Sequence, residues 1–294
     1  MAHATFQVGN LTAVIGDNEA HGKHRAGYNG IHELVHRDEP ANVFVPTVAG
    51  LNLEHVFDGD KDLRNRDDAK VFFEPRHAPM SFKKLSDSEA ELHQPPTPIY
   101  KLESWTRFKL VTPHYVDITF RCQATQHVFH HKYIGLFWAS YINAPEDKST
   151  YFLGGKRWRQ LCTPEHNSQS TVVHRDNKFD LEFSPGAAET LYKSFSPLKF
   201  DEPFFYGLFR KQVLILMFDR GDGIRFSHSP SGGGDNAELQ TTNPAWDFQF
   251  IIPAYEVMRD YGFRARAVYR ERCSREEIVR EFSTWRKALD NQGK

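Results

Sequence analysis

The most regular stretch of this chain reads Tyr115-Val116-Asp117-Ile118-Thr119-Phe120-Arg121-Cys122. Apolar and polar side chains alternate along it, which is the period-two pattern of a strand with one face in a protein core. Cys122 ends the apolar series, and we interpret it as a small core residue. The stretch therefore predicts a half-buried β-strand.

Further strand-like segments lie on both sides of this stretch. They are Val43–Val48, Val71–Phe73, Arg107–Val111, Tyr133–Trp138, Thr171–His174, Phe179–Phe183, Val213–Phe218, Phe248–Ile252 and Phe263–Tyr269. Turn-forming residues such as Gly221-Asp222-Gly223 separate them. Many strands with few helices favour an all-β sandwich or barrel over alternating βαβ units.

One helix is predicted at the C-terminal end, over residues 274–290. Ser274 and Glu277 have the spacing of a capping box, and an apolar stripe follows them at Ile278, Phe282, Trp285 and Leu289. We expect this helix to pack across the outside of a sheet. Because no repeat and no Pro-rich linker divides the chain, we expect residues 1–294 to form a single large β-sandwich domain.

The bulk composition narrows the class of protein. The 294 residues include 24 Phe and 5 Trp, which is ample material for a large core. A net charge of −1 with interspersed signs argues against nucleic-acid binding, and no apolar run is long enough to span a membrane. The first residues lack the pattern of a secretion signal, and three sparse cysteines favour reduced thiols. We therefore predict a cytoplasmic protein, or a periplasmic or secreted one if a signal has been removed.

Side chains suited to sugar binding gather between residues 74 and 138. The segments are Glu74-Pro75-Arg76-His77, Leu92-His93-Gln94, Glu103-Ser104-Trp105 and Tyr133–Trp138. Aromatic rings offer flat apolar faces to the C–H surfaces of a sugar, and the Arg guanidinium offers planar donors to hydroxyls or a carboxylate. This mixture indicates a carbohydrate site.

A second group of candidate residues lies in the segment Trp246-Asp247-Phe248-Gln249. Strand alternation puts Phe248 on one face and Asp247 with Gln249 on the other. A carboxyl group beside an indole can have a raised pKa and serve as a general base. The polar loop from Ser229 to Asn243, which precedes this segment, is long enough to be either a functional lid or disordered.

Two segments are rich in histidine. His127, His130 and His131 could hold a metal, although no HExxH motif is present and surface histidines are the alternative. In the loop Glu19–Gly30, the glycines make a helix improbable, so the spacing of His21 and His24 does not indicate a ligand pair. That loop either feeds His, Arg and Tyr into a pocket or is simply solvated.

The order of these pieces resembles the galactose-mutarotase-like superfamily, which includes the aldose 1-epimerases. Arg76 stands where those proteins carry an early arginine, Leu92-His93-Gln94 is similar to their Leu-His-Gly, and Asp247-Phe248-Gln249 is similar to their Glu-x-Gln. The segment Tyr133–Trp138 lacks the mid-chain histidine of the epimerases. The resemblance implies an antiparallel β-supersandwich with a sugar cleft on one concave face.

The combined interpretation is a carbohydrate-active protein that binds a sugar or a uronic-acid-containing saccharide and performs epimerase- or lyase-like acid–base chemistry. His93 or His130 would be the acid and Asp247 the base. The remaining binding residues would be Arg76, His77, Trp105, Trp138, Trp246 and Gln249. The alternatives are a non-catalytic carbohydrate-binding protein and a metal-dependent enzyme that uses the His127–His131 segment. For the preferred reading we expect no metal and no cofactor; a homo-oligomer is a further option.

Overall fold

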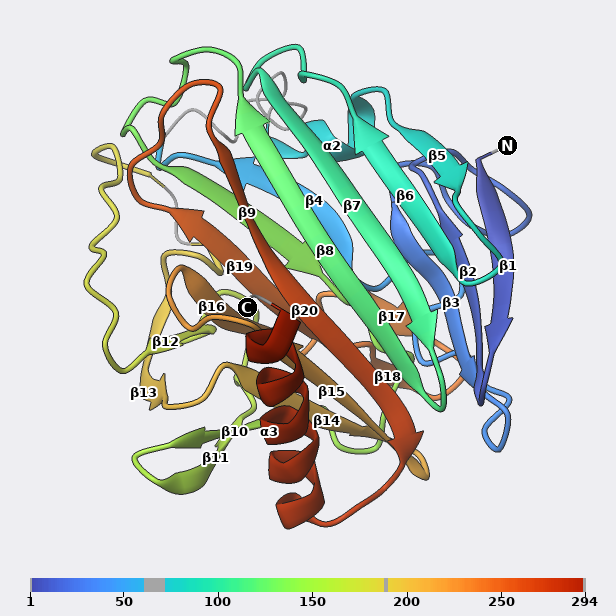
Figure 1. Ribbon diagram of the computed structural model, residues 1–294. Coiled ribbons are helices and arrows are strands. Elements are labelled where there is room, and N and C mark those ends of the chain that lie inside the picture. Colours follow the sequence, from blue (N-terminus) through green and yellow to red (C-terminus); the bar gives the residue numbers. More distant parts are fainter. Residues whose placement is uncertain (1, 61–71, 188–189, 293–294) are drawn as a thin grey trace.

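A computed structural model describes residues 2–60, 72–187 and 190–292, and its strands form two large facing sheets (Figure 1). The nine-stranded sheet has the order β11 (Arg157–Leu161), β10 (Thr150–Gly154), β14 (Phe204–Phe209), β15 (Gln212–Phe218), β20 (Asp260–Glu271), β8 (Tyr115–Ala124), β7 (Leu102–Val111), β6 (Glu89–Gln94) and β5 (Ser81–Lys84). The six-stranded sheet has the order β13 (Phe195–Phe200), β12 (Thr171–His174), β16 (Ile224–Ser229), β19 (Ala245–Ile252), β9 (Ile134–Ala139) and β4 (Asn52–Phe57). Apart from the parallel pair β12–β13, neighbouring strands in both sheets are antiparallel.

Smaller elements complete the architecture. A three-stranded sheet is formed by β1 (His3–Val8), β2 (Leu11–Gly16) and β3 (Gly30–His36), and a short hairpin by β17 (Asp235–Asn236) and β18 (Thr241–Thr242). Within the described ranges, the helices are α2 (Glu74–His77) and α3 (Arg275–Gln292). The predicted all-β supersandwich with a C-terminal helix is confirmed. No helix among the described residues is long and apolar enough to cross a membrane.

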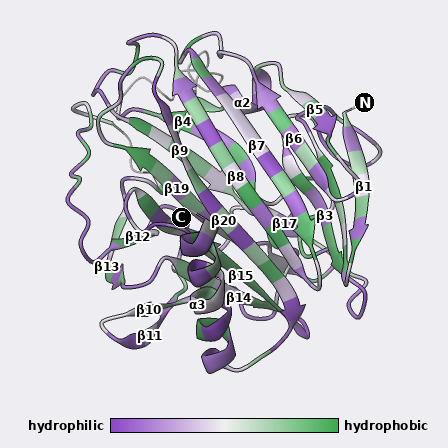
Figure 2. Cartoon of the chain, viewed as in Figure 1, coloured by the Kyte–Doolittle hydropathy of each residue, from purple (hydrophilic) through white to green (hydrophobic). Residues whose placement is uncertain are grey.

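The strand predicted from Tyr115 to Cys122 lies within β8, near the middle of the nine-stranded sheet. Its residues alternate between buried and more exposed, and β7 and β20 beside it show the same alternation of hydropathy (Figure 2). The buried ring of Phe120 packs edge-to-face on Trp138 of β9, with 5.2 Å between centroids. The core therefore lies between the two sheets, and the far face of β6, β7 and β8 is solvated.

The six-stranded sheet differs because its central strands are buried on both faces. Every residue of β9 and β19 is buried. Phe248 of β19 packs on Phe218 and Phe263 of the nine-stranded sheet, so the even-numbered residues of β19 face the core. The odd-numbered residues, including Asp247 and Gln249, lie on the opposite face, which irregular segments cover.

The C-terminal helix begins as predicted. The Ser274 hydroxyl accepts a hydrogen bond from the Glu277 backbone N–H, and the Glu277 carboxylate accepts one from the Ser274 backbone N–H, which is the reciprocal capping box. Ile278, Phe282 and Trp285 pack against apolar side chains of β14, β15 and β20. The helix therefore covers the outer face of one end of the nine-stranded sheet.

Three of the predicted strands are wrong. Val43–Val48 forms an irregular segment with an isolated bridge at Phe44, and Phe179–Phe183 has no regular structure. Phe72 and Phe73 lead into α2, whereas Val71 lies outside the described residues. The apolar residues that suggested strands are instead used to cover other parts of the molecule: Phe72 packs on His55, and Phe183 stacks on Tyr192.

Candidate functional site

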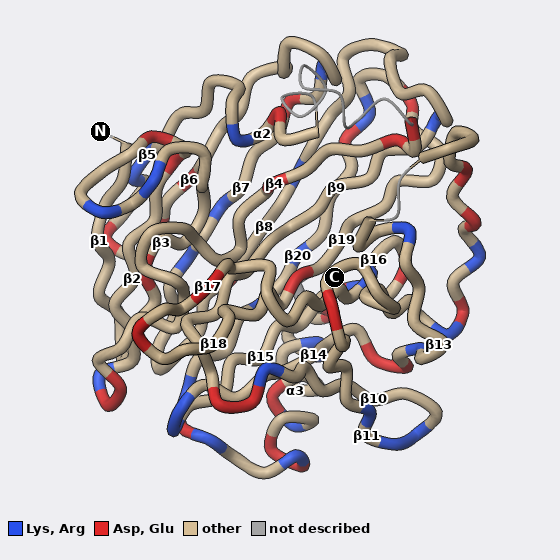
Figure 3. The backbone as a smooth tube through the Cα atoms, turned by 180° about the vertical axis from the view of Figure 1, so that it is seen from behind, with Lys and Arg blue, Asp and Glu red and all other residues tan. Residues whose placement is uncertain are grey.

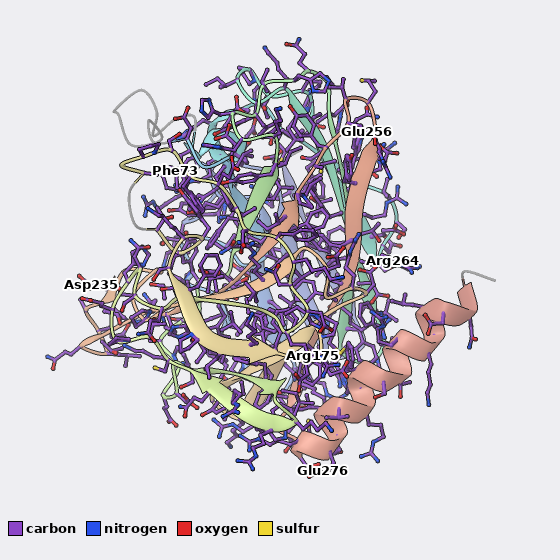
Figure 4. All side chains as sticks on the ribbon, turned by 90° about the vertical axis from the view of Figure 1, so that its left-hand side faces the viewer. Phe73, Arg175, Asp235, Glu256, Arg264 and Glu276 are labelled. Carbon is purple, nitrogen blue, oxygen red and sulfur yellow. The ribbon has the colours of Figure 1, made fainter. Side chains whose placement is uncertain are left out.

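The covered face of the six-stranded sheet contains a cavity of about 270 Å³. Strands β4, β9 and β19 provide its floor, and the segments around Phe73, Asn167, Leu191 and Gly232 provide its walls. The described lining residues are Glu54, His55, Phe72, Phe73, Phe137, Ala139, Tyr141, His166, Asn167, Thr190, Leu191, Tyr192, Ser229, Gly232, Ala245 and Asp247. Phe73 lies on the opposite side of the molecule from Arg264 of the nine-stranded sheet (Figure 4). The volume lies just below the ~300–1,000 Å³ of drug-sized ligand sites, so it suits one small molecule.

Asp247 projects into this cavity from the middle of β19. Its side chain is almost completely buried, and its Oδ1 accepts a hydrogen bond of 2.9 Å from the backbone N–H of Ser140. Burial raises the pKa of Asp247 well above its usual range; the Ser140 hydrogen bond opposes this rise, and the nearby charge of Glu54 adds to it. Asp247 therefore keeps its proton to a higher pH than an exposed aspartate does.

Glu54 is the second buried carboxyl group of the cavity. It lies at a β-bulge in β4, where the register shifts between Leu53 and His55, so that Glu54 and His55 both line the cavity although they are consecutive. The carboxylate accepts hydrogen bonds from Asn52 at 2.9 Å, from His55 Nε2 at 3.0 Å and from the Tyr141 hydroxyl. Arg76 Nη1 lies 3.8 Å away.

These donors decide the charge of Glu54. Burial opposes its ionisation, but the hydrogen bond from His55 and the charges and donors around it outweigh burial and lower the pKa of Glu54. Burial also raises the pKa of Tyr141, as do the neighbouring charge of Glu54 and the hydrogen bond to it. The cavity wall thus holds a glutamate whose ionised form is favoured, a tyrosine hydroxyl bonded to it, and an aspartic acid whose protonated form is favoured. Such divergent pKa values are typical of acid–base pairs in enzymes.

Aromatic rings form the apolar part of the lining. His55 lies between Phe72 and Phe137, with ring centroids 3.9 Å and 4.9 Å away. Tyr192 stacks on Phe57 beneath the cavity and lies 5.8 Å from Phe72. At the exposed edge, His166 Nδ1 is 2.7 Å from the Ser229 hydroxyl. The cavity therefore combines flat apolar surfaces with a few oriented polar groups, which is the usual composition of a small-ligand site.

Three of the residues predicted for the site lie in or next to the cavity. Asp247 lines it. Gln249 shares the face of Asp247 but is buried, and its amide donates to the hydroxyls of Thr171 at 3.0 Å and Ser227 at 2.8 Å. Arg76 lies behind Glu54, where its guanidinium stacks on Tyr28 at 4.1 Å from the ring centroid.

The structure places the other predicted residues elsewhere. His93 and Trp105 stack on each other on the solvated face of the nine-stranded sheet, where His93 Nε2 is 2.8 Å from the Glu103 carboxylate. Trp138 and Trp246 lie on the face of the six-stranded sheet opposite to that of Asp247, and they are buried between the two sheets. His77 is exposed at the end of α2, and His130 lines a separate surface hollow with His131. None of these six residues is among the described lining residues of the cavity.

The histidines proposed as metal ligands do not converge either. His127 lies against Tyr255, 5.6 Å between centroids, while His130 contacts His131 edge-on. Within the described ranges, the histidines whose ligand atoms gather closely enough for a metal are His21, His24 and His32. They belong to the histidine-rich loop and the strand that follows it.

The polar cavity residues that were not singled out from the sequence include Glu54, His55, Tyr141 and His166. The segment Asn52-Leu53-Glu54-His55-Val56-Phe57 carries a usable signal, because a carboxylate and a histidine stand together within a short apolar run. Tyr141 lies just beyond a predicted strand, and nothing in the local pattern around His166 distinguishes it. A search for buried polar pairs in apolar segments would have found the first two.

No protein-family profile matches the sequence, and no curated protein matches it either. Among solved structures, the chain is similar to a candidate aldose 1-epimerase from Escherichia coli K12, with a TM-score of 0.53, 10% identity, and coverage of 92% of this chain and 99% of that one. It also matches an aldose epimerase homologue from C. elegans, with a TM-score of 0.48, 8% identity, and coverage of 92% and 99%. A third match is a mutant of the heparan sulfate lyase HepC from Pedobacter heparinus, with a TM-score of 0.46, 11% identity, and coverage of 93% and 36%. The first of these matches shows that the chain shares the fold of an aldose 1-epimerase homologue, the galactose-mutarotase-like β-sandwich that the sequence resemblance predicted.

Proposed function

We propose that this protein binds a neutral monosaccharide in the cavity and interconverts its anomers by proton transfer. The observation that carries the proposal is the pair of buried carboxyl groups, Asp247 and Glu54, whose pKa values are shifted in opposite directions. Opening the ring of a cyclic sugar requires a proton at the ring oxygen and removal of a proton from the anomeric hydroxyl. The cavity holds one group suited to each task.

The raised pKa of Asp247 favours the role of acid, in place of the base that the sequence suggested. Its proton passes to the ring oxygen as the ring C–O bond breaks. The anomeric hydroxyl gives its proton to the Tyr141 oxygen, and Tyr141 passes its own proton to Glu54, to which it is hydrogen-bonded. Ring closure on the other face reverses both transfers, so that no proton is gained or lost over the cycle. Acid–base groups of this kind typically contribute ~10²–10⁴-fold to a rate.

The charge of the cavity supports a neutral sugar over a uronate. The described lining residues include no Lys or Arg, and the ionised Glu54 repels an anionic ligand. Arg76 could bind a carboxylate, but its guanidinium is stacked on Tyr28 and close to Glu54. The rings of Phe72, Phe137 and Tyr192 suit the C–H faces of a pyranose.

A non-catalytic sugar-binding protein is the second candidate. The observation that favours it is the saturation of Glu54, whose carboxylate already accepts three hydrogen bonds. A carboxylate with so many donors is a weak proton acceptor. This candidate predicts the same binding without any change in the ligand.

Exchange between the anomers of neutral aldoses, measured by NMR magnetisation transfer, tests the proposal. We expect catalysis by the natural protein and a loss of about 10²–10⁴-fold in Asp247→Asn, with sugar-dependent thermal stabilisation retained. Asp260→Asn is the matched control, since it makes the same chemical change at an exposed residue of β20 that pairs with Arg121. Binding without exchange would identify the second candidate. Preference for a uronate, or formation of an ultraviolet-absorbing unsaturated product, would overturn the substrate and the reaction proposed.

A further inference from the structure

Four histidines gather beside the three-stranded sheet, away from the residues assigned to proton transfer. His3 of β1 stacks on His21, with centroids 3.6 Å apart, and His24 stacks on His32 of β3 at 3.5 Å. His21 Nε2 lies 2.7 Å from His32 Nδ1, which joins the two stacks. This imidazole cluster unites one residue from the start of β1, two from the loop between β2 and β3, and one from β3.

Several nitrogen atoms of the cluster are buried without a hydrogen-bond partner among the described residues. They are His3 Nδ1, His24 Nδ1 and His32 Nε2. His32 is 2% exposed and His24 is 5% exposed. Because His24 Nε2 hydrogen-bonds to the carbonyl of Tyr28 at 2.7 Å and must donate to it, the lone pair of the neutral ring lies on Nδ1. A buried lone pair without a donor is costly unless something else occupies it.

We propose that His21, His24 and His32 form a binding site for a divalent transition cation such as Zn²⁺. One ligand atom from each lies within 4.8 Å of the others. Around a tetrahedral zinc ion with bonds of ~2.0–2.1 Å, ligand nitrogens lie about 3.3 Å apart, so the rings must rotate out of their stacks when the ion binds. An all-imidazole set favours Zn²⁺, Ni²⁺ or Cu²⁺ over Mg²⁺ or Ca²⁺, which prefer oxygen ligands. His3 stacks on His21 and flanks this group.

The contacts of the loop suggest what such an ion would do. The Tyr28 carbonyl accepts from His24, while the Tyr28 ring contacts Arg76 and, edge-on at 5.9 Å, Tyr141. Arg76 Nε also donates to the carbonyl of Gly27 at 3.0 Å. An ion on the cluster would therefore fix the loop that supports Arg76 and Tyr141 from behind. This inference does not depend on sugar chemistry in the cavity.

Zinc binding by the full chain, after treatment with a chelator, tests the proposal. We expect one Zn²⁺ per chain by competition with a chromophoric chelator, and an increase in Tm of about 5 °C at a hundredfold excess over Kd. Co²⁺ should give the intense visible absorption of a tetrahedral site. His21→Gln and His24→Gln should each weaken binding by at least about tenfold.

His127→Gln is the matched control, because His127 is an exposed member of the other histidine-rich segment. Circular dichroism of each variant without metal reports whether the fold is retained. If His32→Gln fails to fold, the partly exposed His21 still decides the question. Absence of zinc binding by the natural protein, or unchanged affinity in both His21→Gln and His24→Gln, would overturn the proposal, as would loss of binding in His127→Gln.

Discussion

The two large sheets carry the same kinds of polar side chain but in opposite environments. On the solvated face of the nine-stranded sheet, His93 contacts Glu103 and Trp105, and the Trp105 ring stacks on Arg121, which pairs with Asp260. On the covered face of the six-stranded sheet, Glu54 contacts His55 and Tyr141, with Asp247 nearby. Seen from behind, basic and acidic residues are interspersed along the chain (Figure 3).

Exclusion of water accounts for the difference between the two faces. An exposed ion pair is screened by solvent and contributes little. On the covered face, burial raises the pKa of Asp247, whereas hydrogen bonds and charges around Glu54 outweigh burial and lower its pKa. The covered face therefore offers groups that can exchange protons with a ligand, and the solvated face offers surface contacts. Carboxylate, histidine and aromatic residues indicate a site only where the fold removes them from water.

The largest expected effect is the difference in stability loss between the replacements of two aromatic residues, Phe137 and Trp105. Phe137→Ala removes a buried ring that packs on His55, and should lower the free energy of unfolding by about 3 kcal/mol or more. Trp105→Ala removes a partly exposed ring whose main contacts are Arg121 and His93, and should cost only ~0.5–1 kcal/mol. Urea denaturation measures both, and equal losses would contradict the contrast.

The loss of folding stability at acid pH should come from buried groups of the six-stranded sheet. Burial lowers the pKa of His228 to about 4. In the neutral form of the ring, Nε2 donates a hydrogen bond to the backbone carbonyl of Lys148, and Nδ1 accepts one from the Thr163 hydroxyl. The unfolded chain takes up the proton at about pH 6.5 and the folded protein does not, so stability is complete above pH 6.5 and falls as the pH decreases toward 4. Between pH 6.5 and 5 this amounts to about 2 kcal/mol, at 1.36 kcal/mol per pH unit.

Substitution isolates that contribution. His228→Gln should flatten the fall in stability between pH 6.5 and 5 by most of this amount, as measured by urea denaturation at each pH. Parallel profiles for the variant and the natural protein would show that other buried groups, such as His32, cause the acid sensitivity.

Strand alternation predicted the local structure well for features that depend on a single strand. It placed the buried side of β8, and its parity put Asp247 and Gln249 together on the face opposite Phe248. The same parity argues against Trp246 as a sugar platform, because Trp246 alternates with Asp247 and faces the core. The capping box at Ser274 could be predicted equally well, because both of its partners lie within a segment of four residues.

Alternation cannot distinguish a solvated face from one that distant segments cover. His93 on β6 and Asp247 on β19 both alternate with apolar neighbours, yet only the second is covered, by residues near 72, 166, 191 and 232. The bulge at Glu54 is a second obstacle, because it turns two consecutive residues toward one cavity against the period of two. These features arise from contacts far apart in the sequence.

A smaller effect should separate the two glutamates. Glu54→Gln leaves one donor around the former carboxylate without its acceptor, and should cost about 1–3 kcal/mol of stability. Glu103→Gln alters a partly exposed contact with His93 and should cost less than about 1 kcal/mol. Thermal unfolding of both variants in the same buffer compares them, and a larger loss for Glu103→Gln would reverse the assignment of the two faces.

The smallest expected effect is that of His93→Gln. His93 contacts Glu103 and Trp105 on the solvated face, and neither of these two is among the described residues that line the cavity. Its replacement should therefore alter anomer exchange by less than about twofold and stability by less than about 1 kcal/mol. A hundredfold loss of exchange with retained folding would mean that the sugar binds on the nine-stranded sheet, because only direct contact with the ligand could give so exposed a histidine that much influence.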